Sequence, residues 1–233
     1  MDEDAIREAL ERVGAAAEPT LEVVHPGRAP AASRLGMLPG SFDPMTVAHA
    51  ALAGALNRDG CDLVLLVYSA RTLPKQDHGG RSAAPPLLAP EARVASLVAF
   101  ARRRPWAAGA VSSHGLLVDQ VEAAARAFGR PEVVLGIGSD KLLQLLDRAW
   151  YEDRDTALKR LFGVARVAYA LREGDAAAVE RAFGAEPRWR ERVTRLALRP
   201  DVADISSREL RRRSRRDVED MVPPEVRPFL GGA

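Results

Sequence analysis

The sequence predicts a three-layered α/β protein in which a mostly parallel, doubly wound sheet lies between helices. Three observations predict this fold class. Short apolar runs alternate with longer segments of helical periodicity, no apolar run reaches the roughly 18 residues of a membrane span, and 233 residues are enough for one substantial core. Because strands and helices alternate, we expect right-handed βαβ units and a ligand crevice at the carboxyl ends of the strands.

The first 33 residues are predicted to stand apart from the main domain. Residues 4–13 have the spacing of an amphipathic helix, but the stretch that follows carries three prolines and little periodicity, as is typical of a linker or irregular arm. The acidic start lacks the basic and then apolar order of a secretory signal, so we expect a cytoplasmic protein. We therefore divide the chain into an N-terminal helix and irregular arm, residues 1–33, and an α/β domain, residues 34–233.

The α/β domain is predicted to be Rossmann-like, because strand and helix patterns follow one another in turn. The predicted strands are 34–38, 62–69, 107–113, 132–139, 163–171 and 193–198. The predicted helices are 46–60, 89–103, 116–129 and 140–150. The segment 78–90 is rich in Gly and Pro, so we expect a loop over the carboxyl edge of the sheet.

Composition argues against several classes of function. The 34 basic residues nearly balance 32 acidic ones, and no aromatic residues interleave the arginines of 208–216, so we expect neither a nucleic acid nor a membrane as partner. Cys61 is the single cysteine, which fits a reducing compartment. The four histidines are scattered and no carboxylate cluster is evident, so we expect no protein-built metal site. The G-x-S-x-G elbow of serine hydrolases is missing as well.

The stretch PGSFDPMTVAH, residues 39–49, has the features of a phosphate-binding turn before a helix. Gly40 permits a close backbone approach, and Thr46 as N-cap puts His49 at the third helical position. A helix N-terminus offers unpaired N–H groups and a positive dipole end. Since that dipole lowers the pKa of a histidine, we expect a neutral donor that gains a proton when phosphate arrives. The structural alternative is an incidental capping histidine.

A second helix start lies near the C-terminus, in DISSRELRRR. Ser206 and Glu209 have the spacing of a capping box, and Arg211 follows one turn on. Two hydroxyl groups and an arginine at one helix start form a second site suited to phosphate. The alternative is plain helix initiation followed by a solvated basic face.

Together, GSFDPMTVAH and ISSRELR resemble the (H/T)xGH and ISSTxxR signatures of the nucleotidylyltransferase superfamily, in the same order and with similar separation. The segment GIGSDKLLQLLDRAW resembles the G-A-D segment and downstream tryptophan of nicotinate and nicotinamide mononucleotide adenylyltransferases. This resemblance implies a transferase of NAD biosynthesis. Its partners would be ATP, accompanied by Mg²⁺, and a small phosphorylated acceptor. The oligomeric state stays open, and a homo-oligomer is one of the alternatives.

The resemblance also implies a role for each matched residue. The implied catalytic residues, which contact phosphate, are His49, Thr46, Lys75 and Arg211. The implied nucleotide-binding residues are Gly40, Ser41, Phe42, Gly138, Asp140, Ser206, Ser207 and Arg208, and Trp150 would stack on the pyridine ring of the acceptor.

Four departures from the family pattern leave alternatives open. Ala48 and Arg208 replace a glycine and a threonine of the signatures, residues 112–120 lack the S-Y-T segment of many bacterial nicotinate enzymes, and residues 1–33 have no counterpart. The acceptor could then be phosphopantetheine, or an alcohol phosphate with CTP as donor, and a non-catalytic nucleotide-binding module is a further alternative. Whether a pyridine acceptor carries a carboxylate or a carboxamide also stays open; a carboxylate would favour a nearby cation such as Arg71 or Arg81.

Overall fold

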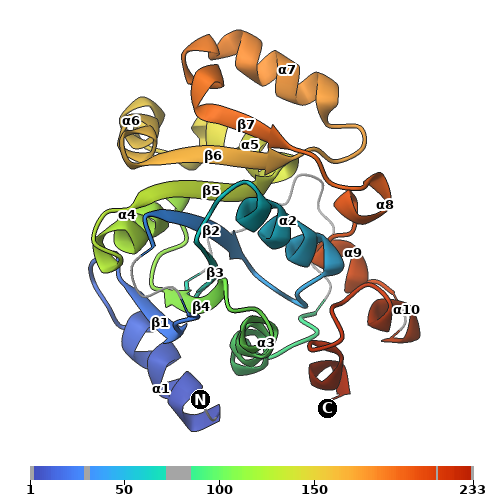
Figure 1. The fold of residues 1–233 in the computed structure, drawn as a ribbon. Helices are drawn as coiled ribbons and strands as arrows, with labels where there is room; N and C mark the ends of the chain where they lie inside the picture. The colour runs from blue at the N-terminus through green and yellow to red at the C-terminus, as the bar shows by residue number, and fades with distance from the viewer. Residues whose placement is uncertain (1–2, 29–31, 72–84, 214, 232–233) are drawn as a thin grey trace.

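The computed structural model describes residues 3–28, 32–71, 85–213 and 215–231 (Figure 1). Within these ranges, seven strands form one sheet in the order β1-β4-β3-β2-β5-β6-β7. β1 pairs with β4 in antiparallel fashion, and all other neighbours are parallel. The strands are β1 (Leu21–His25), β2 (Arg34–Gly40), β3 (Leu63–Ser69), β4 (Ala107–Ser112), β5 (Glu132–Gly138), β6 (Ala165–Ala170) and β7 (Val193–Leu196).

The central strands are apolar on both faces, because helices cover the sheet on both sides. In β3, Leu65 and Val67 belong to one buried cluster, whereas Leu66 and Tyr68 belong to the other. This alternation, in which every residue is apolar, is typical of a parallel sheet buried between two helical layers. The predicted three-layered, mostly parallel fold is therefore confirmed.

Helices from different parts of the chain cover the two faces (Figure 1). One face carries α1 (Glu3–Gly14), α2 (Val47–Arg58) and α3 (Pro90–Arg102), together with α8 (Pro200–Ala203), α9 (Ser207–Leu210), α10 (Arg215–Glu219) and η3 (Arg227–Gly231) of the C-terminal segment. The other face carries α4 (Leu117–Ala127), α5 (Ser139–Leu146), α6 (Arg154–Val164) and α7 (Ala176–Ala185), with the 3₁₀ turns η1 (Arg148–Trp150) and η2 (Pro187–Arg192).

The distance between α2 and the sheet depends on a glycine in β5. A Cβ atom at Gly136 would lie 2.5 Å from Cδ1 of Leu56, a fully buried residue of α2. Only a residue without a side chain allows this approach. Because α2 begins two residues before His49, the same contact helps to fix the height of His49 above the sheet.

The N-terminal segment is more regular than predicted. The expectation of a linker or irregular arm is wrong for Leu21–His25, which forms β1 at the edge of the sheet. The prolines on both sides of this stretch favour a loop in the sequence pattern, whereas the strand is stabilised by backbone pairing with β4. The apolar face of α1, with Ile6, Ala9 and Val13 buried, packs into the same cluster as α3.

Among the helices of ten or more residues in the described ranges, α6 and α7 were absent from the sequence-based prediction. The strand expected at 163–171 begins at Ala165, because the residues before it end α6. None of the helices in the described part of the chain combines the length and the apolar character that crossing a bilayer requires.

Candidate active site

The order of the strands reverses between β2 and β5, at the centre of the sheet. From β2 the chain builds outward through β3 and β4, and β5 then returns to the other side of β2. In open α/β sheets, ligands bind at the carboxyl ends of the strands at such a point. Gly40 ends β2 and Gly138 ends β5, so two of the three segments singled out in the sequence begin at this edge.

Thr46 and His49 form a reciprocal capping box at the start of α2. The backbone N–H of His49 donates to Thr46 Oγ1 over 3.3 Å, and the backbone N–H of Thr46 donates to His49 Nδ1 over 3.1 Å. The predicted N-cap and the predicted third helical position are thus confirmed. Because Nδ1 accepts a backbone N–H, the neutral imidazole carries its proton on Nε2, which is the nitrogen left to act as a donor.

The pKa of His49 lies well below its ordinary value of 6.5, at about 4. Burial of the imidazole is the largest cause, the positive charge of Arg172 lowers the pKa further, and the carboxylate of Asp140 acts in the opposite direction. The predicted direction is right, but burial rather than the helix dipole is the main reason. His49 is therefore a neutral donor at pH 7.

Phe42 lies beside His49 and fills the space above Gly40. The two ring centroids are 5.1 Å apart, and the phenyl ring is fully buried. A Cβ at Gly40 would lie 3.0 Å from the phenyl Cζ, so the glycine makes room for a side chain of the chain itself. Phe42 has a φ of 43°, in the left-handed region, which turns the chain sharply after β2. The neighbouring Ser41 is exposed.

The C-terminal signature packs directly against the turn before α2. Ser207 Oγ donates to the carbonyl oxygen of Pro44 over 2.8 Å, and Arg211 Nη1 lies 3.1 Å from Asp43 Oδ2. Ser206 is the N-cap of α9, and its Oγ accepts the backbone N–H of Glu209. Figure 1 shows α9 beside the beginning of α2. The two segments that the sequence singled out near opposite ends of the chain are therefore in contact.

The segment after β5 is linked to the loop after β6. Ser139 Oγ donates to Asp175 Oδ2 over 2.6 Å and accepts the backbone N–H of Arg172 over 3.0 Å. Asp140 Oδ1 lies 3.5 Å from Arg172 Nε and folds back over Gly138, where a Cβ would come within 2.6 Å of it. These contacts place a cation, Arg172, near the imidazole of His49.

Sequence reasoning missed Arg172. The signal was present, because this arginine directly follows the predicted strand 163–171 and the carboxyl ends of parallel strands share one edge. It was overlooked because a single arginine in a charged loop is ordinarily solvated. Only the sheet order, which puts β6 next to β5, brings it to Asp140.

The chain matches solved structures, although no family model matches it and no curated protein matches its sequence. A Plasmodium falciparum nicotinic acid mononucleotide adenylyltransferase complexed with APC matches with a TM-score of 0.50 and 14% identity, over 84% of this chain and 94% of that chain. The chain shares the fold of this adenylyltransferase. A Plasmodium falciparum nicotinic acid mononucleotide adenylyltransferase complexed with NaAD matches with a TM-score of 0.49, 14% identity and the same coverage.

Of three further predicted residues, the structure describes only Trp150 in full. Lys75, like Arg81, lies outside the described residues, and the described part of Arg208 is its backbone in α9. Trp150 ends η1 and is partly buried. Among the described residues, no hydrogen bond or ring contact connects Trp150 to His49, and its stacking on a pyridine ring stays a prediction.

Arg71, considered above as a cation for a pyridine carboxylate, is bound to the N-terminal segment. Its guanidinium donates to the carbonyl oxygens of Gly14, at 2.8 and 3.1 Å, and Ala16, at 2.9 Å. Gly14 ends α1 and Ala16 follows it, and a cation is favourable at the C-terminus of a helix. The same segment reaches the end of β4, where the Ser113 N–H donates to the Thr20 carbonyl oxygen and the Thr20 N–H donates to Ser113 Oγ. Within this fold, residues 14–20 therefore brace the loops after β3 and β4.

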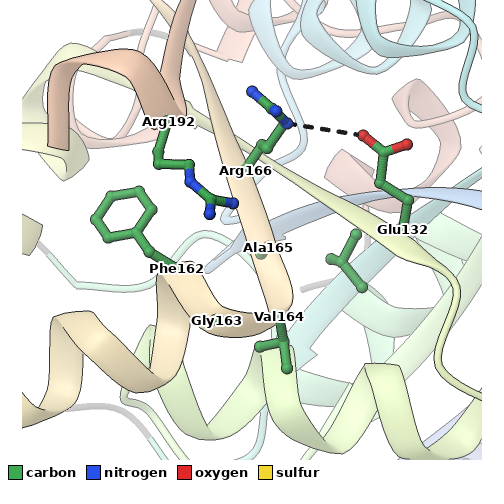
Figure 2. Close-up of a pocket in the computed structure, with 8 residues that line it drawn as sticks. Glu132, Phe162, Gly163, Val164, Ala165, Arg166 and Arg192 are labelled. Atoms are coloured by element: carbon green, nitrogen blue, oxygen red, sulfur yellow. Dashed lines mark ion pairs between the residues drawn. The ribbon is translucent and has the colours of Figure 1, made fainter.

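A hollow of about 280 Å³ lies at the opposite edge of the sheet (Figure 2). Phe162, Arg166 and Arg192 line it, and Arg166 Nε is 4.0 Å from Glu132 Oε1. Its lining comes from the end of α6, the amino ends of β5 and β6, and η2, and includes none of the predicted site residues. We therefore locate the candidate site at the carboxyl edge. In the described part of the chain, no group of three or more His, Cys, Asp or Glu residues is arranged to hold a metal ion.

Proposed function

We propose that this chain is an adenylyltransferase that joins ATP to nicotinate or nicotinamide mononucleotide and releases pyrophosphate. The contact between the two signatures supports this most strongly: Ser207 Oγ reaches the Pro44 carbonyl, and Arg211 reaches Asp43. It brings the C-terminal helix start to the turn that leads into α2 and His49. The pyridine mononucleotide named for the Plasmodium falciparum enzyme of this fold favours the same class of acceptor.

The proposed reaction needs no protein nucleophile. An oxygen of the acceptor phosphate attacks the α-phosphorus of ATP and forms a new P–O bond. The bond from the α-phosphorus to the oxygen that bridges to the β-phosphorus breaks, and pyrophosphate leaves with that electron pair. Both reactants are anions, so the protein contributes by holding them in line and by compensating negative charge.

The chain offers a polar partner for each part of the nucleotide in this proposal. His49 Nε2–H donates to the α-phosphate, where the neutral ring adds a hydrogen bond without the cost of a buried charge. Ser206 and Arg211 bind the β- and γ-phosphates. Asp140, held back over Gly138, accepts from the adenosine half of ATP.

Magnesium enters this reaction as part of the substrate. Mg²⁺ on ATP keeps several water ligands and takes phosphate oxygens, so a dedicated cage of carboxylates is unnecessary. The ion would neutralise charge on the polyphosphate, and the residues at the two helix starts would orient it.

The direct test is to incubate purified protein with MgCl₂ and ATP and to measure pyrophosphate with each acceptor in turn. The acceptors are nicotinate mononucleotide, nicotinamide mononucleotide and phosphopantetheine, and a parallel reaction contains CTP and an alcohol phosphate. Release that depends on a pyridine mononucleotide, with the dinucleotide detected by mass spectrometry, is the expected result. Release with another acceptor alone would replace our acceptor assignment. Tight binding of MgATP without release in any reaction would identify a non-catalytic nucleotide-binding module.

A further inference from the structure

Asp43 is a fully buried carboxylate that makes four polar contacts. Its Oδ1 accepts the backbone N–H groups of Leu87 and Leu88, each over 2.9 Å. Its Oδ2 lies 3.2 Å from Arg93 Nη2 and 3.1 Å from Arg211 Nη1. The carboxylate is thus fully used, and at 0% exposure it is inaccessible to any ligand.

The four contacts connect segments that are far apart in the sequence. Asp43 belongs to the turn before α2, Leu87 and Leu88 to the segment before α3, Arg93 to α3, and Arg211 to the end of α9. A buried carboxylate without partners would be strongly unfavourable, so its four donors must be in place together. The position of each segment is therefore coupled to the position of the other three.

The arginine at the end of α9 is only partly satisfied by this contact. The Arg211 side chain is 8% exposed, and its Nη1 is the atom that meets Asp43. Its Nε is buried and has no hydrogen-bond partner. Two guanidinium groups meet one carboxylate here, so the cluster keeps a net positive charge. An unpaired donor of a buried arginine is costly, and an anion bound against this guanidinium would satisfy it.

We propose that Asp43 is a positioning residue for polyphosphate binding. Asp43 Oδ2 binds Arg211 Nη1 and so orients the rest of the guanidinium toward the phosphates. Asp43 Oδ1 binds the segment before α3 to the same point. This inference rests on the proposed function, because it assumes that ATP occupies the carboxyl edge. It assigns Asp43 no contact with substrate, since the carboxylate acts only through Arg211 and the backbone of residues 87 and 88.

A purely structural ion pair would stabilise the fold without selectively changing the affinity for MgATP. We therefore compare Asp43→Asn with the wild type by calorimetric titration with MgATP and, separately, with the acceptor mononucleotide. Asn has the same size and keeps an oxygen for the two backbone N–H groups, but it lacks the charge that orients Arg211. We expect the Kd for MgATP to rise at least about tenfold and the Kd for the acceptor to stay within about twofold.

The matched control disrupts another partly buried ion pair, between Arg104 and Glu225, whose atoms are 3.0 Å apart. Arg104→Gln should lower the melting temperature and leave the Kd for MgATP unchanged. Arg211→Lys should weaken MgATP binding about as much as Asp43→Asn, and the double variant should be no weaker than either, because both changes remove the same oriented guanidinium. Additive losses, or wild-type affinity in Asp43→Asn, would overturn the inference.

Two further outcomes keep this test independent of folding and of the proposed reaction. If Asp43→Asn does not fold, Asp43→Glu takes its place, because it retains the charge but moves the carboxylate by one methylene. Its affinity for MgATP should still fall several-fold, and an unaltered affinity would refute the inference.

A wild-type chain that binds MgATP but releases no pyrophosphate contradicts the proposed function alone, because the MgATP affinities of the variants still show whether Asp43 positions Arg211. A wild-type chain that does not bind MgATP contradicts both.

Discussion

Ser207 Oγ donates a 2.8 Å hydrogen bond to the carbonyl oxygen of Pro44, a residue 163 positions earlier in the chain. The serine is 8% exposed, so water competes little for this bond. The bond fixes the first turn of α9 against the turn that leads into α2. Neither of the two helix starts can shift without the other.

Ser207→Ala should therefore destabilise the protein. The substitution leaves a buried carbonyl without its donor, which costs about 1–2 kcal/mol of the free energy of unfolding. Urea denaturation followed by circular dichroism measures the difference. Ser41→Ala is the control, because Ser41 is exposed and its hydroxyl should contribute little. Equal stabilities of the Ser207 and Ser41 variants would contradict the importance of the contact.

His49→Asn should lower the rate of pyrophosphate release much more than it weakens substrate binding. Asn keeps a polar group near the Nδ1 position but cannot extend an Nε2–H donor. Loss of one donor to developing charge typically costs about 3 kcal/mol, which is a 10²–10³-fold decrease in kcat. Steady-state kinetics with saturating MgATP measures it. His25→Asn, on β1, should keep the wild-type rate, and a decrease of less than about threefold in His49→Asn would exclude the imidazole as the donor.

The pKa of His49 should respond in opposite directions to two neighbouring substitutions. Arg172→Gln removes a positive charge that lowers the pKa, so the pKa should rise. Asp140→Asn removes a negative charge that raises it, so the pKa should fall further. An NMR titration of the imidazole Cε1–H resonance reports both shifts. Two shifts of the same sign would mean that the loop after β6 does not lie where the structure has it.

The stability of the protein should fall as the pH is lowered through the titration range of His49. The folded-state pKa, about 4, is below the ordinary value of 6.5, so between these values the unfolded chain binds more protons than the folded one. The stabilisation is fully present above pH 6.5 and is lost toward pH 4, with a limit of about 3 kcal/mol.

Urea unfolding of the wild type and of His49→Asn at pH 7, 6, 5 and 4 measures this loss. The difference in free energy of unfolding between the two should shrink steadily with falling pH. A constant difference across the series would show that the imidazole titrates equally in both states.

The sequence predicted local features better than distant ones. The Thr46–His49 capping box could be predicted because both residues belong to one helical turn, where side-chain reach decides the geometry. The pairing of Asp43 with Arg211 could not, since it depends on how α9 packs onto the sheet. The strand at Leu21–His25 was missed for the same reason: β4 provides its hydrogen bonds, and no signal within five residues between prolines reveals that partner.

The causes of a property were also harder to predict than its direction. A lowered pKa for His49 followed from its place in the first helical turn, but burial is the dominant cause, and burial depends on Phe42 and on the close approach of α2 at Gly136. Arg172 was overlooked because its importance arises from the neighbouring position of β5 and β6 in the sheet. Motif spacing therefore indicated His49, whereas packing determines the chemistry of its imidazole.

The antiparallel pairing of Leu21 with Ser112 has a consequence for folding during translation. The segment that becomes β1 is translated before β4, and its hydrogen-bonding partner is complete only once residue 112 has been added. During this interval its backbone N–H and C=O groups are an open template for other nascent chains. Chaperone demand during translation should therefore be greatest between the synthesis of β1 and the completion of β4.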